Sequence, residues 1–186
     1  MVATIKHPHV GFFPALPLAN NLELGDWMVG TPPANVVWRS DRFKAGVALA
    51  GVYDWIYGYG LKSQAELLIE GIRSGTLEAQ IVESGQIRLG KPFWKDPAPY
   101  IRNSPIFHVE SIDAPLLLLH GDLDLGVTGL AGAERMYNAL ARAGKKPALV
   151  RYWGEGHVAQ SEWAIRDQWS RITRWFNAYL KPDVQR

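Results

Sequence analysis

The feature that most constrains the fold is a pair of short apolar runs separated by a helical pattern. Residues 115–120, Pro-Leu-Leu-Leu-Leu-His, suit a strand buried on both faces, and residues 148–153, Ala-Leu-Val-Arg-Tyr-Trp, suit another. Between them, residues 129–143 predict a helix that stops at a glycine, with an apolar face of Leu130, Ala133, Met136 or Tyr137, and Leu140. Strand, helix and strand in this order predict parallel strands with right-handed crossovers, and therefore an α/β fold.

Further elements flank this unit. Residues 44–52 form another short apolar run that suits a buried strand. From Ser161 the chain predicts a long helix whose core face comprises Ile165, Trp169, Ile172, Phe176 and Tyr179. A helix is also expected over residues 61–73, and the Gly- and Pro-rich stretch 84–109 predicts loop with short helical turns. Residues 1–40 are punctuated by prolines and keep no strand or helix period for long.

Composition narrows the class of protein. The 186 residues are 47% hydrophobic, which is enough for one domain with a sizeable core. The 20 basic and 18 acidic residues are spread along the chain, without the Lys/Arg cluster of a nucleic-acid-binding protein. Cysteine is absent, which excludes disulfides, thiolate metal sites and cysteine catalysis. We therefore expect no nucleic-acid partner and no cofactor.

The sequence also argues against membrane and metal binding. It contains no run of about 18 apolar residues, so no transmembrane helix is predicted. The apolar segment 10–19 is interrupted by prolines and is followed by no signal-peptide cleavage site. We expect a soluble, cytoplasmic protein, with a periplasmic or secreted location left open for a full-length form. His7 and His9 have no third ligand nearby in the sequence, so no metal site is expected.

Two polar loops follow the last two predicted strands. Residues 121–127 read Gly-Asp-Leu-Asp-Leu-Gly-Val, and residues 154–157 read Gly-Glu-Gly-His. Because reacting groups gather at the carboxyl ends of strands in open α/β sheets, an aspartate of the first loop and His157 can meet. Asp followed by His is the α/β-hydrolase order, in which the carboxylate orients the imidazole and the imidazole takes the proton of a serine hydroxyl. His120, which precedes the first loop, is expected to be a structural histidine.

These loops belong to a longer series of motifs. Residues from about Asp41 to Leu180 resemble the C-terminal part of the catalytic domain of prolyl-oligopeptidase-family serine peptidases. The resemblance rests on residues 40–46, on Gly51-Val52-Tyr53-Asp54-Trp55, on Ser104-Pro105 with Val109 and Ala114-Pro115, on Gly121-x-x-Asp124-x-x-Val127, and on Gly154-x-Gly156-His157. It implies that residues 41–182 are the C-terminal part of an α/β-hydrolase catalytic domain that acts on peptides.

The resemblance also assigns site residues. It makes Asp124, rather than Asp122, the catalytic carboxylate and His157 the catalytic base. Residues Val52, Trp55 and Val127 fall where the family lines the pocket for the residue before the scissile bond. Their apolar character suits a small group such as proline, although Trp55 could equally serve only in packing.

The chain departs from the family at the nucleophile. The sequence contains no Gly-x-Ser-x-Gly, the elbow that presents the serine. Counting back from Asp41 by the family's spacing reaches residues 25–30, where Trp27 occupies the serine position. The Thr-Pro-Pro that follows does not suit a helix beyond its first turn. We therefore predict a partial α/β-hydrolase that lacks the nucleophile strand and elbow, preceded by an atypical Pro-rich segment at residues 1–40.

Without a nucleophile strand, the strand at residues 44–52 would have an unpaired edge. Such an edge offers unsatisfied N–H and C=O groups to another chain. The sequence therefore predicts self-association through an exposed sheet edge.

Three functions stay open at this point. One is a serine peptidase of the prolyl-oligopeptidase type, which hydrolyses peptide bonds through an acyl-enzyme, with this chain an inactive fragment of it. The second is a non-catalytic scaffold that binds peptides or a partner, which the missing serine favours. The third is a related esterase or dienelactone hydrolase. The Tyr53-Asp54-Trp55 loop and the Ser104-Pro105 pair favour the peptidase family over the esterases.

Overall fold

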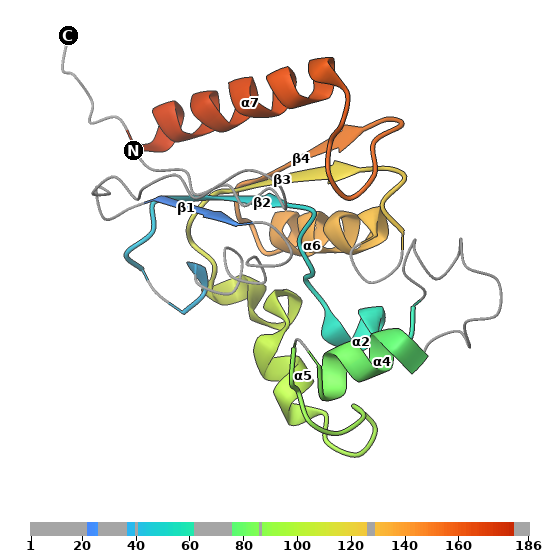
Figure 1. Ribbon diagram of the computed structural model, residues 1–186. Coiled ribbons are helices and arrows are strands. Elements are labelled where there is room, and N and C mark those ends of the chain that lie inside the picture. Colours follow the sequence, from blue (N-terminus) through green and yellow to red (C-terminus); the bar gives the residue numbers. More distant parts are fainter. Residues whose placement is uncertain are drawn as a thin grey trace, which may run out of the picture.

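Four parallel strands form the centre of the described part of the chain. The computed structural model describes residues 22–25, 37–39, 41–61, 76–85, 87–125 and 129–180. The strands form one sheet in the order β1-β2-β3-β4 (Figure 1), and they are β1 (Leu22–Gly25), β2 (Ala45–Leu49), β3 (Leu116–Gly121) and β4 (Pro147–Tyr152). Every neighbouring pair is parallel. The predicted α/β class with parallel strands is confirmed.

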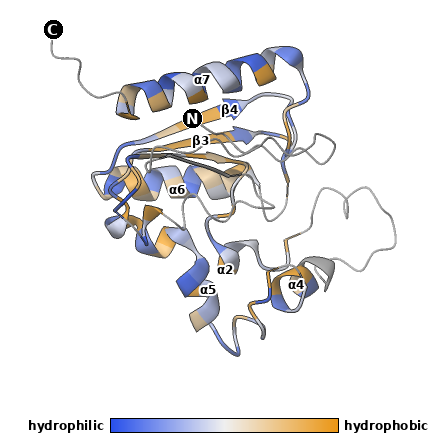
Figure 2. Cartoon of the chain, turned by 60° about the vertical axis from the view of Figure 1, so that its left-hand side comes forward, coloured by the Kyte–Doolittle hydropathy of each residue, from blue (hydrophilic) through white to orange (hydrophobic). Residues whose placement is uncertain are grey.

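Helices cover both faces of the sheet. α6 (Leu130–Arg142) lies on one face and α7 (Glu162–Leu180) on the other (Figure 1). Both mix hydrophilic and hydrophobic residues, as expected of helices with one buried side (Figure 2). The shorter helices lie beyond α6, and they are α2 (Trp55–Gly58), α4 (Thr76–Glu83), α5 (Ala98–Asn103) and the 3-10 helix η1 (Pro105–Ser111). No helix among the described residues combines the length and apolar character needed to cross a membrane.

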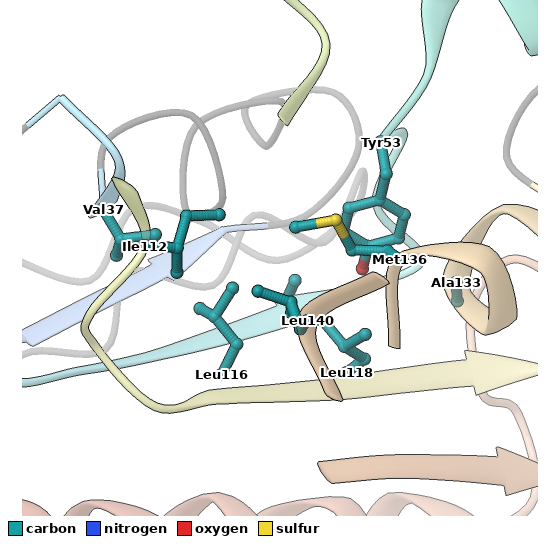
Figure 3. Close-up of a cluster of buried hydrophobic side chains, with 9 residues drawn as sticks. Val37, Tyr53, Ile112, Leu116, Leu118, Ala133, Met136 and Leu140 are labelled. Atoms are coloured by element: carbon teal, nitrogen blue, oxygen red, sulfur yellow. The ribbon is translucent and has the colours of Figure 1, made fainter. Parts of the chain in front are cut away.

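The middle of the core is β3, because its leucines alternate between the two helical layers. On one face, Leu116 and Leu118 pack with the buried side of α6 (Figure 3), which comprises Ala133, Met136 and Leu140. On the other face, Leu117 and Leu119 pack with α7 through Ile172 and Phe176. The predicted apolar face of α6 is therefore confirmed, with Met136 rather than Tyr137 at the fully buried position.

The prediction that the strand at residues 44–52 has an unpaired edge is wrong. β1 lies parallel to β2, with Leu22 opposite Ala45 and Gly25 opposite Ala48. Its four residues are too few to reveal a period, and pairing with the otherwise open edge of β2 supplies their hydrogen-bond partners. Consequently β2 is paired on both sides, and β1 is the edge strand on that side of the described sheet. Of the residues where the elbow was sought, 25–30, only Gly25 is among the described residues.

The predicted core face of α7 is only partly right. Ile172 and Phe176 are buried as expected, but Ile165, Trp169 and Tyr179 are 36–41% exposed. The row that meets β2 and β3 contains Ala164, Ile172 and Phe176, which are separated by multiples of four residues. Residues four apart stack on one side of a helix, so the small Ala164, rather than its large neighbour Ile165, faces the sheet.

The segments between β2 and β3 were harder to predict. The helix expected over residues 61–73 lies, apart from Leu61, outside the described residues. α4, at 76–83, was not predicted. The Gly- and Pro-rich stretch contains the short α5 and η1, in agreement with the expected short helical turns.

Candidate active site

The candidate site is built from the loops that follow β3 and β4. These strands pair in parallel, with Gly121 opposite Tyr152 at their carboxyl ends. The loop after β3, residues 122–125, therefore starts beside the loop after β4, residues 153–157, at the same edge of the sheet (Figure 1).

Backbone contacts hold the two loops together. The Leu123 N–H donates to the Glu155 carbonyl over 2.9 Å, and the Gly154 N–H donates to the Asp122 carboxylate over 2.6 Å. At Gly121 the approach is so close that an added Cβ would lie 2.7 Å from the carbonyl carbon of Glu155 and nearer still to two carbonyl oxygens. Position 121 therefore has room only for glycine. The hydrogen bond from Gly154 to the Asp122 carboxylate connects the two loops.

The same loops bring Asp124 and His157 together. His157 Nδ1 lies 2.9 Å from Asp124 Oδ2. The Asp124 side chain is 2% exposed and that of His157 is 23% exposed. Because a carboxylate can only accept, Nδ1 is the donor, and the lone pair of the neutral imidazole is on Nε2. The arrangement can therefore take up a proton at Nε2 and stabilise the resulting charge through Asp124.

A second imidazole also meets Asp124. His120, at the end of β3, places Nε2 at 3.0 Å from Oδ2, the oxygen that His157 also contacts. The His120 side chain is 0% exposed. His120, which was expected to be a structural histidine, therefore contacts a residue of the candidate site. The four-residue spacing of His120 and Asp124 is visible in the sequence, but whether they meet depends on the turn between them.

Glu155, to which the sequence analysis assigned no role, is also buried here. Its carboxylate accepts hydrogen bonds from the Ser161 hydroxyl and from the Gln160 N–H, the latter over 2.7 Å. These two donors hold the pKa of Glu155 below its ordinary value, with the Ser161 hydroxyl as the larger cause. Glu155 therefore fastens the loop that carries His157 to the start of α7.

Two of the residues assigned to the substrate pocket, Val52 and Trp55, come from the segment that follows β2. Val52 and Trp55 are buried in an apolar cluster with Val82 and Tyr100. Ser104 stabilises that cluster, since its hydroxyl accepts from the Trp55 N–H over 2.8 Å and donates to the Tyr100 carbonyl over 2.7 Å. Val127 lies outside the described residues.

The described residues offer no evident metal centre. No three His, Cys, Asp or Glu side chains among them gather closely enough to hold a metal ion.

Comparison with known proteins identifies the family of the chain. A parallel α/β sheet with an aspartate and then a histidine on adjacent carboxyl-end loops is typical of α/β-hydrolases. The chain belongs to the prolyl oligopeptidase family, peptidase S9, whose family model matches residues 34–183.

Two curated relatives are peptidases. The chain is 24% identical to the uncharacterized peptidase YuxL of Bacillus subtilis over 78% of this chain and 20% of that protein. It is 27% identical to the probable chloroplastic glutamyl endopeptidase of Arabidopsis thaliana over 80% of this chain and 16% of that protein. The chain thus spans a fifth or less of the length of these relatives.

Solved structures share the fold. A puromycin-hydrolysing peptidase of Mycobacterium tuberculosis matches with a TM-score of 0.68 at 22% identity, over 84% of this chain and 21% of that one. The acylaminoacyl peptidase of Pyrococcus horikoshii matches with a TM-score of 0.68 at 21% identity, over 89% of this chain and 24% of that one.

Proposed function

We propose that Asp124 and His157 are the orienting carboxylate and the general base of a prolyl-oligopeptidase-type serine peptidase site. The observation that carries the proposal is the 2.9 Å contact between His157 Nδ1 and a buried carboxylate at the carboxyl edge of the sheet. In such a site, the imidazole takes the serine proton during attack on the peptide carbonyl and returns it to the leaving amine. The negative carboxylate stabilises the intervening imidazolium.

The proposal extends to domain organisation and substrate. Residues 41–182 are the C-terminal part of a catalytic domain, and the family match over residues 34–183 includes this range. The substrate is a peptide, with Val52, Trp55 and Val127 lining the pocket for the residue before the scissile bond. Burial of the first two in an apolar cluster supports an apolar pocket wall. The outer edge of β1 is the proposed surface for self-association.

The chain alone is proposed to be inactive, because the sequence lacks Gly-x-Ser-x-Gly. Histidine without the serine has only water to activate. The oxyanion hole also needs the N–H of the residue after the nucleophile. Loss of one oxyanion donor from an intact enzyme costs about 10²–10³ in rate, and here the nucleophile is missing too.

The inactivity is tested with a fluorophosphonate probe, which labels activated serines. We expect no adduct by mass spectrometry after incubation with the folded chain, and no cleavage of proline or acyl-peptide substrates. A family enzyme with its serine intact, treated in parallel, provides the positive control. Stoichiometric labelling of a serine that disappears in His157→Ala would reveal a relocated nucleophile and contradict the inactive assignment.

The acid–base pair is tested separately, by NMR of protein labelled with ¹⁵N in histidine. We expect His157 Nδ1–H to give a downfield proton signal that exchanges slowly with water, because the proton is held by the carboxylate. Asp124→Ala should abolish the signal. Asp113→Ala removes a carboxylate whose side chain is 93% exposed and should leave it unchanged. A signal that survives Asp124→Ala would refute the proposed pair.

The non-catalytic scaffold is the second candidate, and the missing serine favours it. A scaffold would be as inactive as a peptidase fragment, but it would have to bind a ligand. Saturable binding of a proline-containing peptide without cleavage, measured by calorimetry, would favour it over an inactive peptidase fragment.

A further inference from the structure

Two imidazoles converge on one carboxylate oxygen in this site. His120 Nε2 lies 3.0 Å and His157 Nδ1 lies 2.9 Å from Asp124 Oδ2. From this geometry we infer that His120 is a positioning residue, which fixes the Asp124 carboxylate so that it can receive His157. The inference rests on the proposed function, since it assigns a task to His120 only if Asp124 orients a catalytic base.

The backbone segments that carry His120 and Asp124 differ in rigidity. His120 is part of β3, which is paired with β2 on one side and with β4 on the other. Asp124 lies in the loop beyond the strand, outside any helix or strand. Groups on strands are held more closely than groups on loops. A side chain anchored in β3 can therefore restrain the carboxylate.

The burial of His120 points to the same task. Its side chain is 0% exposed, at the end of a strand that otherwise contributes leucines to the core. Neither ring nitrogen makes an aligned hydrogen bond among the described residues. A buried polar group without a partner destabilises the folded chain, so a purely structural role favours leucine here. The short approach to Asp124 is the polar interaction that accounts for an imidazole at this position.

The chemistry of the contact specifies the tautomer. An ionised carboxylate has no proton to give, so the hydrogen must lie on His120 Nε2. The 3.0 Å separation is within hydrogen-bond distance, although the ring is not aligned as a donor. Catalytic hydrogen bonds are often poorly aligned before substrate binds. An aligned N–H of His120 then stops rotation of the Asp124 carboxylate.

The test compares two substitutions of the same residue. His120→Leu keeps the volume apolar and removes the N–H, whereas His120→Gln returns an amide N–H near the former Nε2. The readout is the exchange rate of the His157 Nδ1–H signal, in the full chain. We expect exchange to accelerate at least tenfold in His120→Leu, with a native backbone spectrum, and to stay within threefold of the wild type in His120→Gln. A structural role would leave this proton unaffected in a folded variant.

The outcomes separate this inference from the proposed function. If the wild type shows no signal that depends on Asp124, the acid–base pair itself fails. If the signal depends on Asp124 but is unchanged in folded His120→Leu, only the positioning role is overturned. If His120→Leu does not fold, His120→Phe replaces it. If neither folds, His120→Gln decides, because a retained slow signal supports the inference and a lost one overturns it.

Discussion

Gly121→Ala should destabilise the chain by on the order of 3 kcal/mol, near the upper end of what overpacking a core costs. The added Cβ would lie 2.7 Å from the carbonyl carbon of Glu155 and closer to the carbonyl oxygens of Glu155 and Gly156. All of these are backbone atoms, which cannot rotate away as a side chain can. The strand ends must therefore separate, and urea-induced unfolding should detect the change as a lower midpoint.

A second glycine provides a control, because its substitution by alanine should change the stability in the opposite direction. Gly132 lies within α6, and a Cβ added there meets no atom within 4 Å. Alanine is favoured over glycine inside a helix by about 0.5–1 kcal/mol, so Gly132→Ala should raise the unfolding midpoint slightly. If Gly121→Ala unfolded at the wild-type midpoint, the close approach of the two loops would be wrong, and with it the basis of the Asp124–His157 contact.

The part of the site that could be predicted is the part that follows from the order of strands and loops along the chain. An apolar run long enough to form β3 or β4 is visible in the sequence, and its first polar residues mark the carboxyl end of the strand. Adjacent parallel strands bring those ends together. For this reason an aspartate of the first loop could be paired with His157 from the sequence, and the family resemblance selected Asp124 over Asp122. In the structure, Asp124 Oδ2 lies 2.9 Å from His157 Nδ1.

The contacts that escaped prediction depend on geometry between segments. β1 is four residues long and exists through its pairing with β2, so its own sequence carries little signal. His120 meets Asp124 only because the turn after β3 folds the chain back by the required amount. For α7, apolar size favoured Ile165 and Trp169, yet the sheet selects the row that contains Ala164.

Glu155→Gln should lower stability by about 2 kcal/mol at neutral pH, the size expected for hydrogen bonds to a charged group. In the wild type the carboxylate accepts from the Ser161 hydroxyl and the Gln160 N–H. Glutamine keeps one acceptor oxygen but loses the charge, and its NH₂ group faces a donor. The variant should therefore loosen the connection between the His157 loop and α7. Glu110→Gln, at an exposed position, should change stability by less than about 0.5 kcal/mol.

The effect should also depend on pH, with a sign set by the direction of the pKa shift. Because the pKa of Glu155 is lowered in the folded chain from its ordinary 4.5, the carboxylate contributes its stability fully above pH 4.5. That contribution is lost as the pH falls through the lower, folded-state pKa. Glutamine does not titrate, so the stability gap between wild type and Glu155→Gln should narrow as the pH falls below 4.5. Denaturant unfolding of both proteins between pH 3 and pH 7 measures this gap, and a gap that stayed constant throughout would show that the charge of Glu155 does not fasten the His157 loop.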